Sequence, residues 1–399
     1  MTKLLDLKNN QIIAINQNNY TKEDNYKKVC YLDTDNITNN RINAFLKIDL
    51  TKEKLPSRAK RKCSLNSIIY SSVRPNQRHF GIIKEIPKNF LVSTAFIVID
   101  IIDLKKLDPN YLYYYITQDK ITHYLQCIAE CGTSSYPSIT PLDFLNIKIK
   151  LYPLETQRKI ARTLSILDQK IENNHKINEL LHKILELLYE QYFVRFDFLD
   201  ENNKPYQTSG GKMKFSKELN RLIPSGWSVR FLNHKIVSTY QPKTISKTLL
   251  NDSYSYSVYG GGGIIGRFTE YNHEQSEFII SCRGQCGISY LTLPKSWITG
   301  NAMVIRPTKS YTSKTYLYHT IKKYKLTNYI TGSVQPQITR QNLSTMPILI
   351  PKRKTLNKWN NISSLLWNLI HNNMQSTQTL TALRDFLLPL LLTQQVKPQ

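Results

Sequence analysis

The sequence has few cysteines, few acidic residues and no long apolar run. Its 6 cysteines are two isolated residues and two pairs with three residues between them, a spacing that lacks the Cys-x2-Cys knuckle typical of zinc sites. No apolar run approaches the roughly 18 residues of a membrane span, and no signal peptide opens the chain. These absences predict a cytoplasmic protein with reduced cysteines, and they disfavour structural zinc, disulfides and membrane insertion.

Acidic residues are the minority charge. Asp and Glu total 29 against 54 Lys and Arg, which leaves a net charge of +25. Hydrophobic residues make up 41% of the sequence, so the chain has enough apolar surface to fold and is not a disordered basic tail. A folded protein this basic is expected to bind a polyanion, and nucleic acid is favoured over anionic lipid. A length of 399 residues favours two domains.

Motifs for catalysis are also missing. The stretch Gly261-Gly262-Gly263-Ile264-Ile265-Gly266 has G-x-G-x-x-G spacing, but no helical pattern follows it, so we interpret it as a turn between strands. Asp108-Pro109-Asn110-Tyr111 lacks the second proline of the D-P-P-Y motif of amino-methyltransferases, and a helix cap explains it better. No G-x-x-x-x-G-K-[ST] loop and no H-E-x-x-H pair is present. The chain by itself is therefore not expected to be an enzyme.

An internal repeat is the most informative pattern. Residues 132–140 read Gly-Thr-Ser-Ser-Tyr-Pro-Ser-Ile-Thr, and residues 332–339 read Gly-Ser-Val-Gln-Pro-Gln-Ile-Thr. Matching residues in and after these stretches lie 199 positions apart: Pro137 and Pro336, Ile139 and Ile338, Thr140 and Thr339, Ile171 and Ile370, Leu181 and Leu380. This register predicts the order domain, helix, domain, helix.

A long helix is predicted after each copy. Residues 154–193 carry apolar side chains at alternating spacings of three and four, the heptad pattern of a coiled coil. Asn174 and Asn178 interrupt this seam, and such asparagines typically fix the register of a helix pair. Residues 354–392 repeat the seam less regularly. We expect the two helices to pack on each other in antiparallel orientation; the alternative is that each packs on its own domain.

The remaining segments predict mixed domains and an α+β fold class. In the first half, residues 67–71 and 90–102 are β-branched and aromatic, which is typical of strands, and a helix over 111–125 follows the cap at Asp108. In the second half, strands are predicted over 254–259, 278–282 and 302–305, and a helix over 316–324. Residues 200–211 form a polar linker. The predicted fold is two mixed α/β domains separated by two long helices packed as an antiparallel coiled coil.

Loops of both halves combine cationic, amide and aromatic groups. Arg and Gln can bond guanine and adenine edges, whereas Lys and backbone amides bind phosphates. The candidate DNA-binding residues are Arg58, Lys60, Arg61, Arg74, Asn76, Gln77, Arg78, Gln241, Lys243, Tyr259, Gly261, Arg283, Gln285, Ser333 and Gln335. Arg74, Arg78, Arg283 and Gln335 are expected to read bases directly. Solvated surface is the alternative for any one of them, but clustering in both halves favours DNA.

Several stretches together resemble the specificity (S) subunit of type I restriction–modification systems. The helix segments 154–161 and 167–174 are similar to the central helical region of that family, and 192–197 with 223–227 are similar to its end and to the start of a second target-recognition domain. Residues 258–266 and 283–287 resemble strand–loop motifs of that domain. One departure is the first domain, which starts at Met1 without a lead-in like Gly226-Trp227. The match covers nearly the whole chain.

The resemblance implies a non-catalytic subunit that reads a bipartite double-stranded DNA site with one domain per half-site. Methyltransferase subunits, with or without restriction subunits, would dock on the helices, and S-adenosylmethionine, ATP and Mg²⁺ would belong to those partners. The expected boundaries are 1–153 and 222–351 for the two target-recognition domains, 154–196 and 352–399 for the helical spacers, and 197–221 for the linker. The alternatives are a self-contained DNA methyltransferase and a coiled-coil scaffold without DNA contacts.

Overall fold

The structure, a computed structural model, describes residues 1–38, 40–132, 136–251, 254–333 and 335–397. The chain divides into two compact units: unit 1 comprises Met1–Asn173 and Thr377–Gln399, and unit 2 comprises Asn174–Ser376. Repeat positions 133–135 and 334 lie outside the described residues. None of the helices within the described ranges is both long and apolar enough to cross a membrane.

The two predicted long helices are present. Helix α5 spans Leu154–Tyr189 and continues as a π-helical turn over Glu190–Val194, and helix α8 spans Arg353–Thr393. Each helix contributes its first part to one unit and its last part to the other. The residues at the predicted seam spacing on α5 are all buried or half-buried: Ile160, Leu164, Leu167, Ile171, Asn174, Asn178, Leu181, Leu185, Leu188 and Tyr192. Some of them, such as Ile160 and Leu185, also belong to the domain cores.

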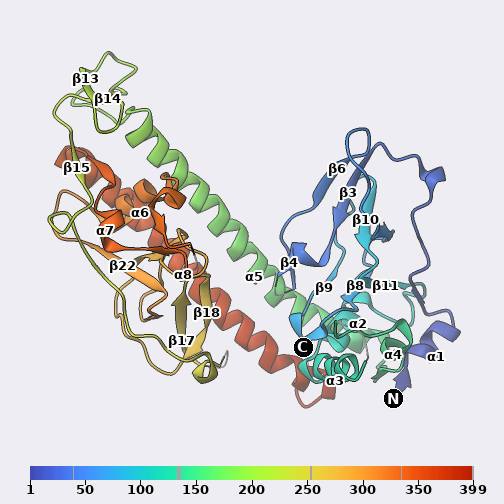
Figure 1. Ribbon diagram of the computed structural model, residues 1–399. Helices are drawn as coiled ribbons and strands as arrows, with labels where there is room; N and C mark the ends of the chain where they lie inside the picture. The colour runs from blue at the N-terminus through green and yellow to red at the C-terminus, as the bar shows by residue number, and fades with distance from the viewer. Residues whose placement is uncertain (39, 133–135, 252–253, 334, 398–399) are drawn as a thin grey trace. The chain divides into compact units, whose positions relative to one another are not determined.

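Within unit 2 the two helices run antiparallel (Figure 1). The Asn178 side chain donates to the Ile370 carbonyl oxygen (3.4 Å) and accepts a hydrogen bond from Asn373 (2.9 Å), while Asn174 donates to the Asn373 carbonyl (3.5 Å). Partner numbers on α8 therefore fall as those on α5 rise. In this way the seam asparagines pair across the helices, and each fixes the register by a hydrogen bond that a slipped register would leave unmade.

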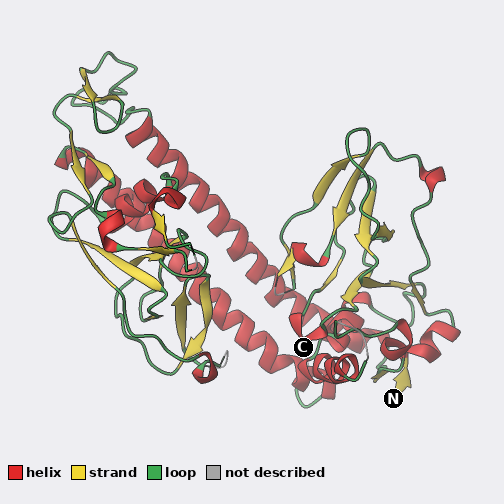
Figure 2. Ribbon diagram, in the orientation of Figure 1, coloured by secondary structure: helices red, strands yellow, loops and turns green. Residues whose placement is uncertain are grey.

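Unit 1 places two four-stranded sheets beside its helices. The antiparallel sheet has the order β2-β11-β8-β9, and the mixed sheet has the order β6-β3-β10-β7. Figure 2 shows helices gathered at one end of these strands. The strands are β1 (Thr2–Lys3), β2 (Ile13–Ile15), β3 (Lys28–Leu32), β4 (Ile37–Thr38), β5 (Arg41–Ile42), β6 (Leu46–Asp49), β7 (Ala59–Arg61), β8 (Ile68–Ser71), β9 (Phe80–Ile82), β10 (Phe90–Ser93), β11 (Phe96–Ile101) and β12 (Lys148–Ile149); the helices are α1 (Leu4–Asn9), α2 (Pro109–Ile116), α3 (Asp119–Glu130) and α4 (Pro141–Leu145).

Unit 2 repeats this arrangement. Its antiparallel sheet has the order β16-β22-β19-β20, and its mixed sheet has the order β18-β17-β21. The strands are β13 (Met213–Ser216), β14 (Arg221–Pro224), β15 (Ser228–Phe231), β16 (Val237–Tyr240), β17 (Tyr256–Gly260), β18 (Gly263–Phe268), β19 (Phe278–Ser281), β20 (Ser289–Leu291), β21 (Trp297–Ile298), β22 (Ala302–Pro307), β23 (Ile330–Thr331), β24 (Gln337–Ile338) and β25 (Pro347–Ile350); the helices are α6 (Lys314–Lys322) and α7 (Arg340–Leu343).

The repeat extends to strand pairing. In both mixed sheets the one parallel pair occupies the same place, β3 with β10 in unit 1 and β17 with β21 in unit 2. In each unit the strand that precedes the long helix pairs antiparallel with a strand from the early part of that unit: β12 with β1, and β25 with β15. The internal repeat predicted from the sequence is thus a repeat of topology.

A buried tyrosine fixes the domain helix to the last strand in each unit. The Tyr111 hydroxyl of α2 donates to the Lys150 carbonyl (2.5 Å), and the Tyr316 hydroxyl of α6 donates to the Leu349 carbonyl (2.6 Å). Both tyrosine side chains are fully buried, so each hydroxyl needs such a partner. Tyr111 and Tyr316 are therefore equivalent positions of the two units.

Two predicted elements of unit 1 are wrong in extent. The strand expected over 90–102 is two strands, because the chain leaves the mixed sheet after β10 and enters the antiparallel sheet with β11. The helix expected over 111–125 is α2 and α3. Gln118 ends α2 by donating to the Tyr115 carbonyl (2.7 Å), and its extended backbone starts α3 in a new direction. The hydrogen bond of the Gln118 side chain thus ends the helix at a point where the apolar periodicity predicts that it continues.

Candidate nucleic-acid interface

Four loops of unit 2, far apart in sequence, meet at one end of its sheets. We call residues 241–243, 260–263, 282–287, 333 and 335–338 the unit 2 loop cluster. The Gln241 side-chain amide donates to the Cys282 Sγ (2.8 Å), and the Ile338 N–H donates to the Cys282 carbonyl (3.1 Å). Three of the four loops are thus joined at Cys282. The sequence could nominate these loops but could not place them together.

The glycine turn supplies the fourth loop. Gly260 pairs with Gly263 at the end of the β17–β18 hairpin, which confirms the predicted strand-to-strand turn. A Cβ atom on Gly261 would come within 2.8 Å of the Arg283 carbonyl oxygen. Glycine at position 261 therefore allows the hairpin tip to pack against the loop that carries Arg283.

The exposed side chains of this cluster are cationic or amidic. Arg283 forms a β-bridge with Gln337, which brings it beside the loop of Ser333 and Gln335. The exposed members of the candidate set in unit 2 are Gln241, Lys243, Arg283, Gln285, Ser333 and Gln335. Such groups can hydrogen-bond to base edges and phosphates.

Tyr259 is a correction to the candidate set. Its side chain is only 3% exposed, and its hydroxyl accepts a hydrogen bond from the Leu293 N–H (3.1 Å). Burial raises the pKa of Tyr259 to about 12. The ring packs among Ile279, Ile298 and Val304, so it supports the sheet and does not face a ligand.

Unit 1 builds an equivalent cluster from residues 58–61, 72–78, 94–95 and 136–139, which we call the unit 1 loop cluster. The Ser72 N–H donates to the Ala95 carbonyl (2.8 Å), and the Ile139 N–H donates to the Ser72 carbonyl (2.8 Å). In unit 2 the matching bonds run from the Cys282 N–H to the Asn301 carbonyl (2.9 Å) and from Ile338 to Cys282. The same three-loop crossing therefore occurs in both units.

The β8–β9 loop of unit 1 is held from two sides. The Arg74 guanidinium lies over the Tyr136 ring, 5.4 Å from its centroid, and the Asn76 N–H donates to the Gln126 side chain on α3 (3.1 Å). Arg74 and Arg78 both have positive φ angles of 47° and 54°. This loop presents Arg74, Asn76 and Gln77 as exposed side chains. The sequence missed Tyr136 and Gln126, because neither stands next to the loop in the chain.

Of the three basic side chains within residues 58–61, two are exposed and one turns inward. Arg58 and Lys60 are exposed, whereas the Arg61 guanidinium turns inward and donates to the Thr94 carbonyl (3.5 Å). Burial lowers the pKa of Arg61. The Thr94 N–H in turn donates to the Arg58 carbonyl (2.8 Å), which links this run to the rest of the unit 1 loop cluster. Arg61 is therefore a poorer candidate for DNA contact than its neighbours.

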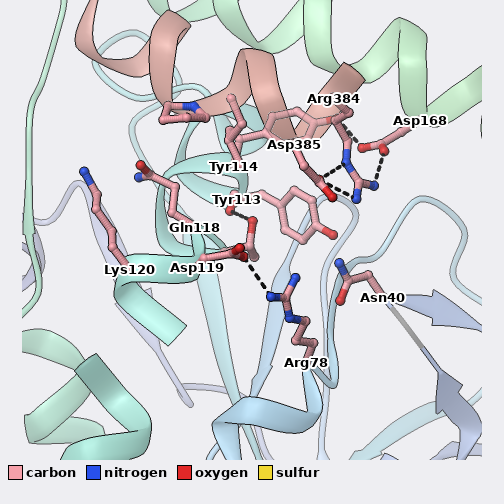
Figure 3. Close-up of a pocket in the computed structure, with 13 residues that line it drawn as sticks. Asn40, Arg78, Tyr113, Tyr114, Gln118, Asp119, Lys120, Asp168, Arg384 and Asp385 are labelled. Carbon is pink, nitrogen blue, oxygen red and sulfur yellow. Dashed lines mark hydrogen bonds and ion pairs between the residues drawn. The ribbon is translucent and has the colours of Figure 1, made fainter. Parts of the chain in front are cut away.

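Arg78 borders a pocket of about 270 Å³ in unit 1, drawn in Figure 3. Its Nη2 lies 2.9 Å from Asp119 Oδ1, and its side chain is 42% exposed. Deeper in the pocket Arg384 pairs with Asp168 (2.8 Å). Arg384 also pairs with Asp385, and Lys120 lines the same pocket, so the wall carries three cations and three carboxylates. To contact a base, Arg78 must exchange Asp119 for the DNA.

The chain matches proteins of known class along most of its length. Residues 5–183 and 224–382 match the family described as the type I restriction modification DNA specificity domain. The HindI specificity subunit of Haemophilus influenzae is 22% identical, over 93% of this chain and 95% of its own. The MjaIX specificity subunit of Methanocaldococcus jannaschii is 24% identical, over 71% of this chain and 68% of its own.

A solved structure has the same fold. The S subunit of a type I restriction–modification system from M. genitalium matches with a TM-score of 0.57 at 15% identity, over 98% of this chain and 95% of its own. The repeated sheets and long helices described above are therefore those of a known architecture.

Proposed function

Because this chain belongs to the family of type I restriction–modification DNA specificity subunits, we propose that its two units each read one half of a bipartite DNA site. The chain is a DNA-recognition subunit with two copies of the specificity domain. Its curated relatives are specificity subunits, so we reject the alternatives of a self-contained methyltransferase and of a scaffold without DNA contacts.

The observation that carries the proposal is the duplicated loop cluster. Both units cross three loops through one residue, Ser72 or Cys282, and both surround that crossing with exposed arginine and amide side chains. A single chain with two equivalent loop clusters is suited to a DNA target with two separate parts. The net charge of +25 favours close approach to DNA through its phosphates.

We assign two kinds of contact to the exposed candidates. Arg74 and Arg283 are the proposed base readers of units 1 and 2, since each guanidinium can bond guanine in bidentate fashion. Arg78 is the second proposed base reader of unit 1, and Gln335 is the second proposed base reader of unit 2. The remaining exposed members, which we propose as phosphate or sugar contacts, are Arg58, Lys60, Asn76, Gln77, Gln241, Lys243, Gln285 and Ser333, with Gly261 shaping the surface. The proposed target-recognition domains span 1–153 and 222–351, the helical spacers span 154–196 and 352–399, and the linker spans 197–221.

The helices offer a surface to a partner protein. Large apolar side chains on α5 stay exposed at spacings of three and four, next to the seam: Ile177, Leu180, Ile184 and Leu187. On α8, Ile362, Leu365 and Leu369 follow the same spacing. An exposed apolar stripe of this kind is typical of an interaction site. We propose that methyltransferase subunits pack against it, and that a restriction subunit, where present, joins through them.

The cofactors of the reaction belong, in this proposal, to those partners. S-adenosylmethionine would be bound by the methyltransferase subunits, and ATP and Mg²⁺ by a restriction subunit. The sequence supports this division because it carries no phosphate-binding loop and no amino-methyltransferase motif of its own.

The test is to co-express the chain with a cognate methyltransferase subunit in a methylation-free host and to sequence the modified sites. The expected result is a motif of two specific blocks separated by unspecified bases. Cells with either subunit alone are the controls and should show no modification. Modification by this chain alone, or a motif with one uninterrupted block, would overturn the proposal.

A further inference from the structure

Unit 2 joins its recognition loops through two thiols. Cys282 is fully buried at the loop crossing, where its Sγ accepts from the Gln241 amide (2.8 Å) and donates to the Asn301 carbonyl oxygen (3.3 Å). The bond from Gln241 fixes the start of the 241–243 loop. One side chain thereby holds three segments that are each brought from a different part of the sequence.

Cys286 makes the second connection. Its Sγ donates to the Pro336 carbonyl oxygen (3.1 Å), and that proline lies between Gln335 and Gln337. Proline has no N–H of its own, so the carbonyl is its one backbone group able to hydrogen-bond to the neighbouring loop. The loop of Cys286 is compact: the Gly287 N–H donates to the Ser281 carbonyl (2.9 Å), and Gly287 has a φ of 92°, a conformation that favours glycine.

The equivalent loop crossing of unit 1 is held by a hydroxyl group in place of a thiol. At the position of Cys282 it has Ser72, whose hydroxyl donates to the Ala95 carbonyl (2.8 Å). The next contact of this loop in unit 1 comes from a helix, since the Asn76 N–H donates to the Gln126 side chain of α3 (3.1 Å). Each loop crossing thus has a side-chain donor, the Ser72 hydroxyl in unit 1 and the Cys282 thiol in unit 2.

We propose that the thiols of Cys282 and Cys286 are positioning groups that hold the unit 2 loop cluster in its DNA-reading arrangement. This inference rests on the proposed function of unit 2. Neither sulfur needs to touch DNA. Cys282 orients the Gln241 loop relative to Arg283, and Cys286 holds the Gln335 loop against it. Loss of either bond frees a reading loop without removing a reading side chain.

The test uses the full chain with its methyltransferase subunit, and the readout is the methylated motif, analysed separately for each half-site. Cys286→Ala removes the donor, whereas Cys286→Ser keeps one. We expect Cys286→Ala to lower discrimination by about threefold at one half-site, the loss of a single weak hydrogen bond, with the other half-site unchanged. Cys286→Ser should restore discrimination. Cys282→Ser imports the chemistry of Ser72 and should also preserve it.

Ser72→Ala in unit 1 is the matched control, and it should relax the opposite half-site. Thermal melting of each variant checks that the loss is local, because a general loss of stability would weaken both half-sites together. An unchanged motif for Cys286→Ala, or an equal loss with Cys286→Ser, would overturn the role of the thiol while leaving the two-part motif of the parent protein in place. A parent protein without a two-part motif would instead overturn the proposed function.

Discussion

The two units share a backbone plan but differ in what fills the junction between their domain helix and the long helices. Three residues after the equivalent tyrosines, unit 1 has Tyr114 and unit 2 has His319. In unit 1 the Tyr114 hydroxyl donates to Asp168 (2.6 Å), and Asp168 pairs with Arg384 (2.8 Å). At the repeat position of Asp168, 199 residues on, unit 2 has Trp367. A charged junction in one unit is therefore an aromatic junction in the other.

The aromatic junction of unit 2 is built from imidazole and indole rings. His319 stacks on Tyr189 with centroids 5.5 Å apart, and His182 contacts Trp367 edge-on at 5.1 Å. Burial, with Lys322 and His182 nearby, lowers the pKa of His319 to about 3. Burial, with Lys314 and His182, lowers the pKa of His371 to about 4. Protonation of His319 or His371 would therefore destabilise the junction.

The charged junction of unit 1 has the opposite requirement. Burial by itself lowers the pKa of Arg384, but the carboxylates of Asp168 and Asp385 outweigh it and raise that pKa. Burial and the Asp168 carboxylate raise the pKa of Tyr114, which keeps its hydroxyl as a donor. The repeat therefore constrains the topology of the two units, whereas the interior side chains of each copy differ in chemistry. This difference also means that each unit can be destabilised separately.

Among single substitutions the largest effect is expected from Arg384→Met. This change leaves Asp168 in a partly buried site without its cation, and we expect a loss of about 3 kcal/mol in the free energy of unfolding of unit 1. Hydrogen exchange should report it, with faster exchange in β8 and β11 and little change in β19 and β22. Arg340→Met, at an exposed position of unit 2, is the control and should cost at most about 0.5 kcal/mol. An equal increase in the rate of hydrogen exchange in both units would contradict the expectation that each unit can be destabilised separately.

Acid should affect the units in the reverse order. The folded-state pKa values of His319 and His371, about 3 and about 4, lie below the unfolded value of about 6.5. The stability that the neutral imidazoles contribute is therefore fully present above about pH 6.5, and it is lost as the pH falls from there towards the folded-state pKa values. From pH 7 to pH 5 each of the two imidazoles should cost about 2 kcal/mol, so we expect unit 2 to lose about 4 kcal/mol through them. Urea unfolding followed by hydrogen exchange measures this loss.

The control for the acid prediction is the pair His319→Phe and His371→Phe. This double variant should keep the ring packing but lose the extra acid sensitivity of unit 2. A difference between the units that persists in the double variant would assign it to other groups. Of these, His182 has a pKa that burial also lowers, and Glu186, Lys322 and Lys314 face the same cluster.

Much of this fold could be predicted from the sequence because its strongest signals are periodic. The heptad seam and the 199-residue register fixed the helices and the repeat. The split between α2 and α3 could not be predicted, since it depends on the hydrogen bond that the Gln118 side chain donates to the Tyr115 carbonyl. The interface was less predictable still. Residue type nominated both Tyr259 and Arg61, and only packing reveals that one is buried and the other turned inward.

A smaller effect is expected at the DNA interface, where the two units should again be separable. Arg74→Ala and Arg283→Ala should each cost about 1.5 kcal/mol and relax one position of a different half-site, because each removes a bidentate base contact that we propose. Lys60→Ala and Lys243→Ala are the controls: they should weaken binding to all sequences and reduce the salt slope by about 1. An unchanged motif after alanine at all four readers, Arg74, Arg78, Arg283 and Gln335, would show that these loops do not read DNA.

If each unit is a complete reader of one half-site, exchange of one domain should change one half of the recognised sequence and leave the other half as it was. Residues 1–153 end just before α5, where Gln157 accepts from the Asp108 N–H (3.0 Å) and donates to the Lys106 carbonyl (3.0 Å). Gln157 stays in the chimera, so the incoming domain should keep the backbone conformation at positions 106 and 108. The methylated motif of the chimera, with the first domain of another family member in place of 1–153, is the measurement. The account predicts a new sequence in one half-site and the original sequence in the other. A change in both half-sites, or in neither, would contradict it.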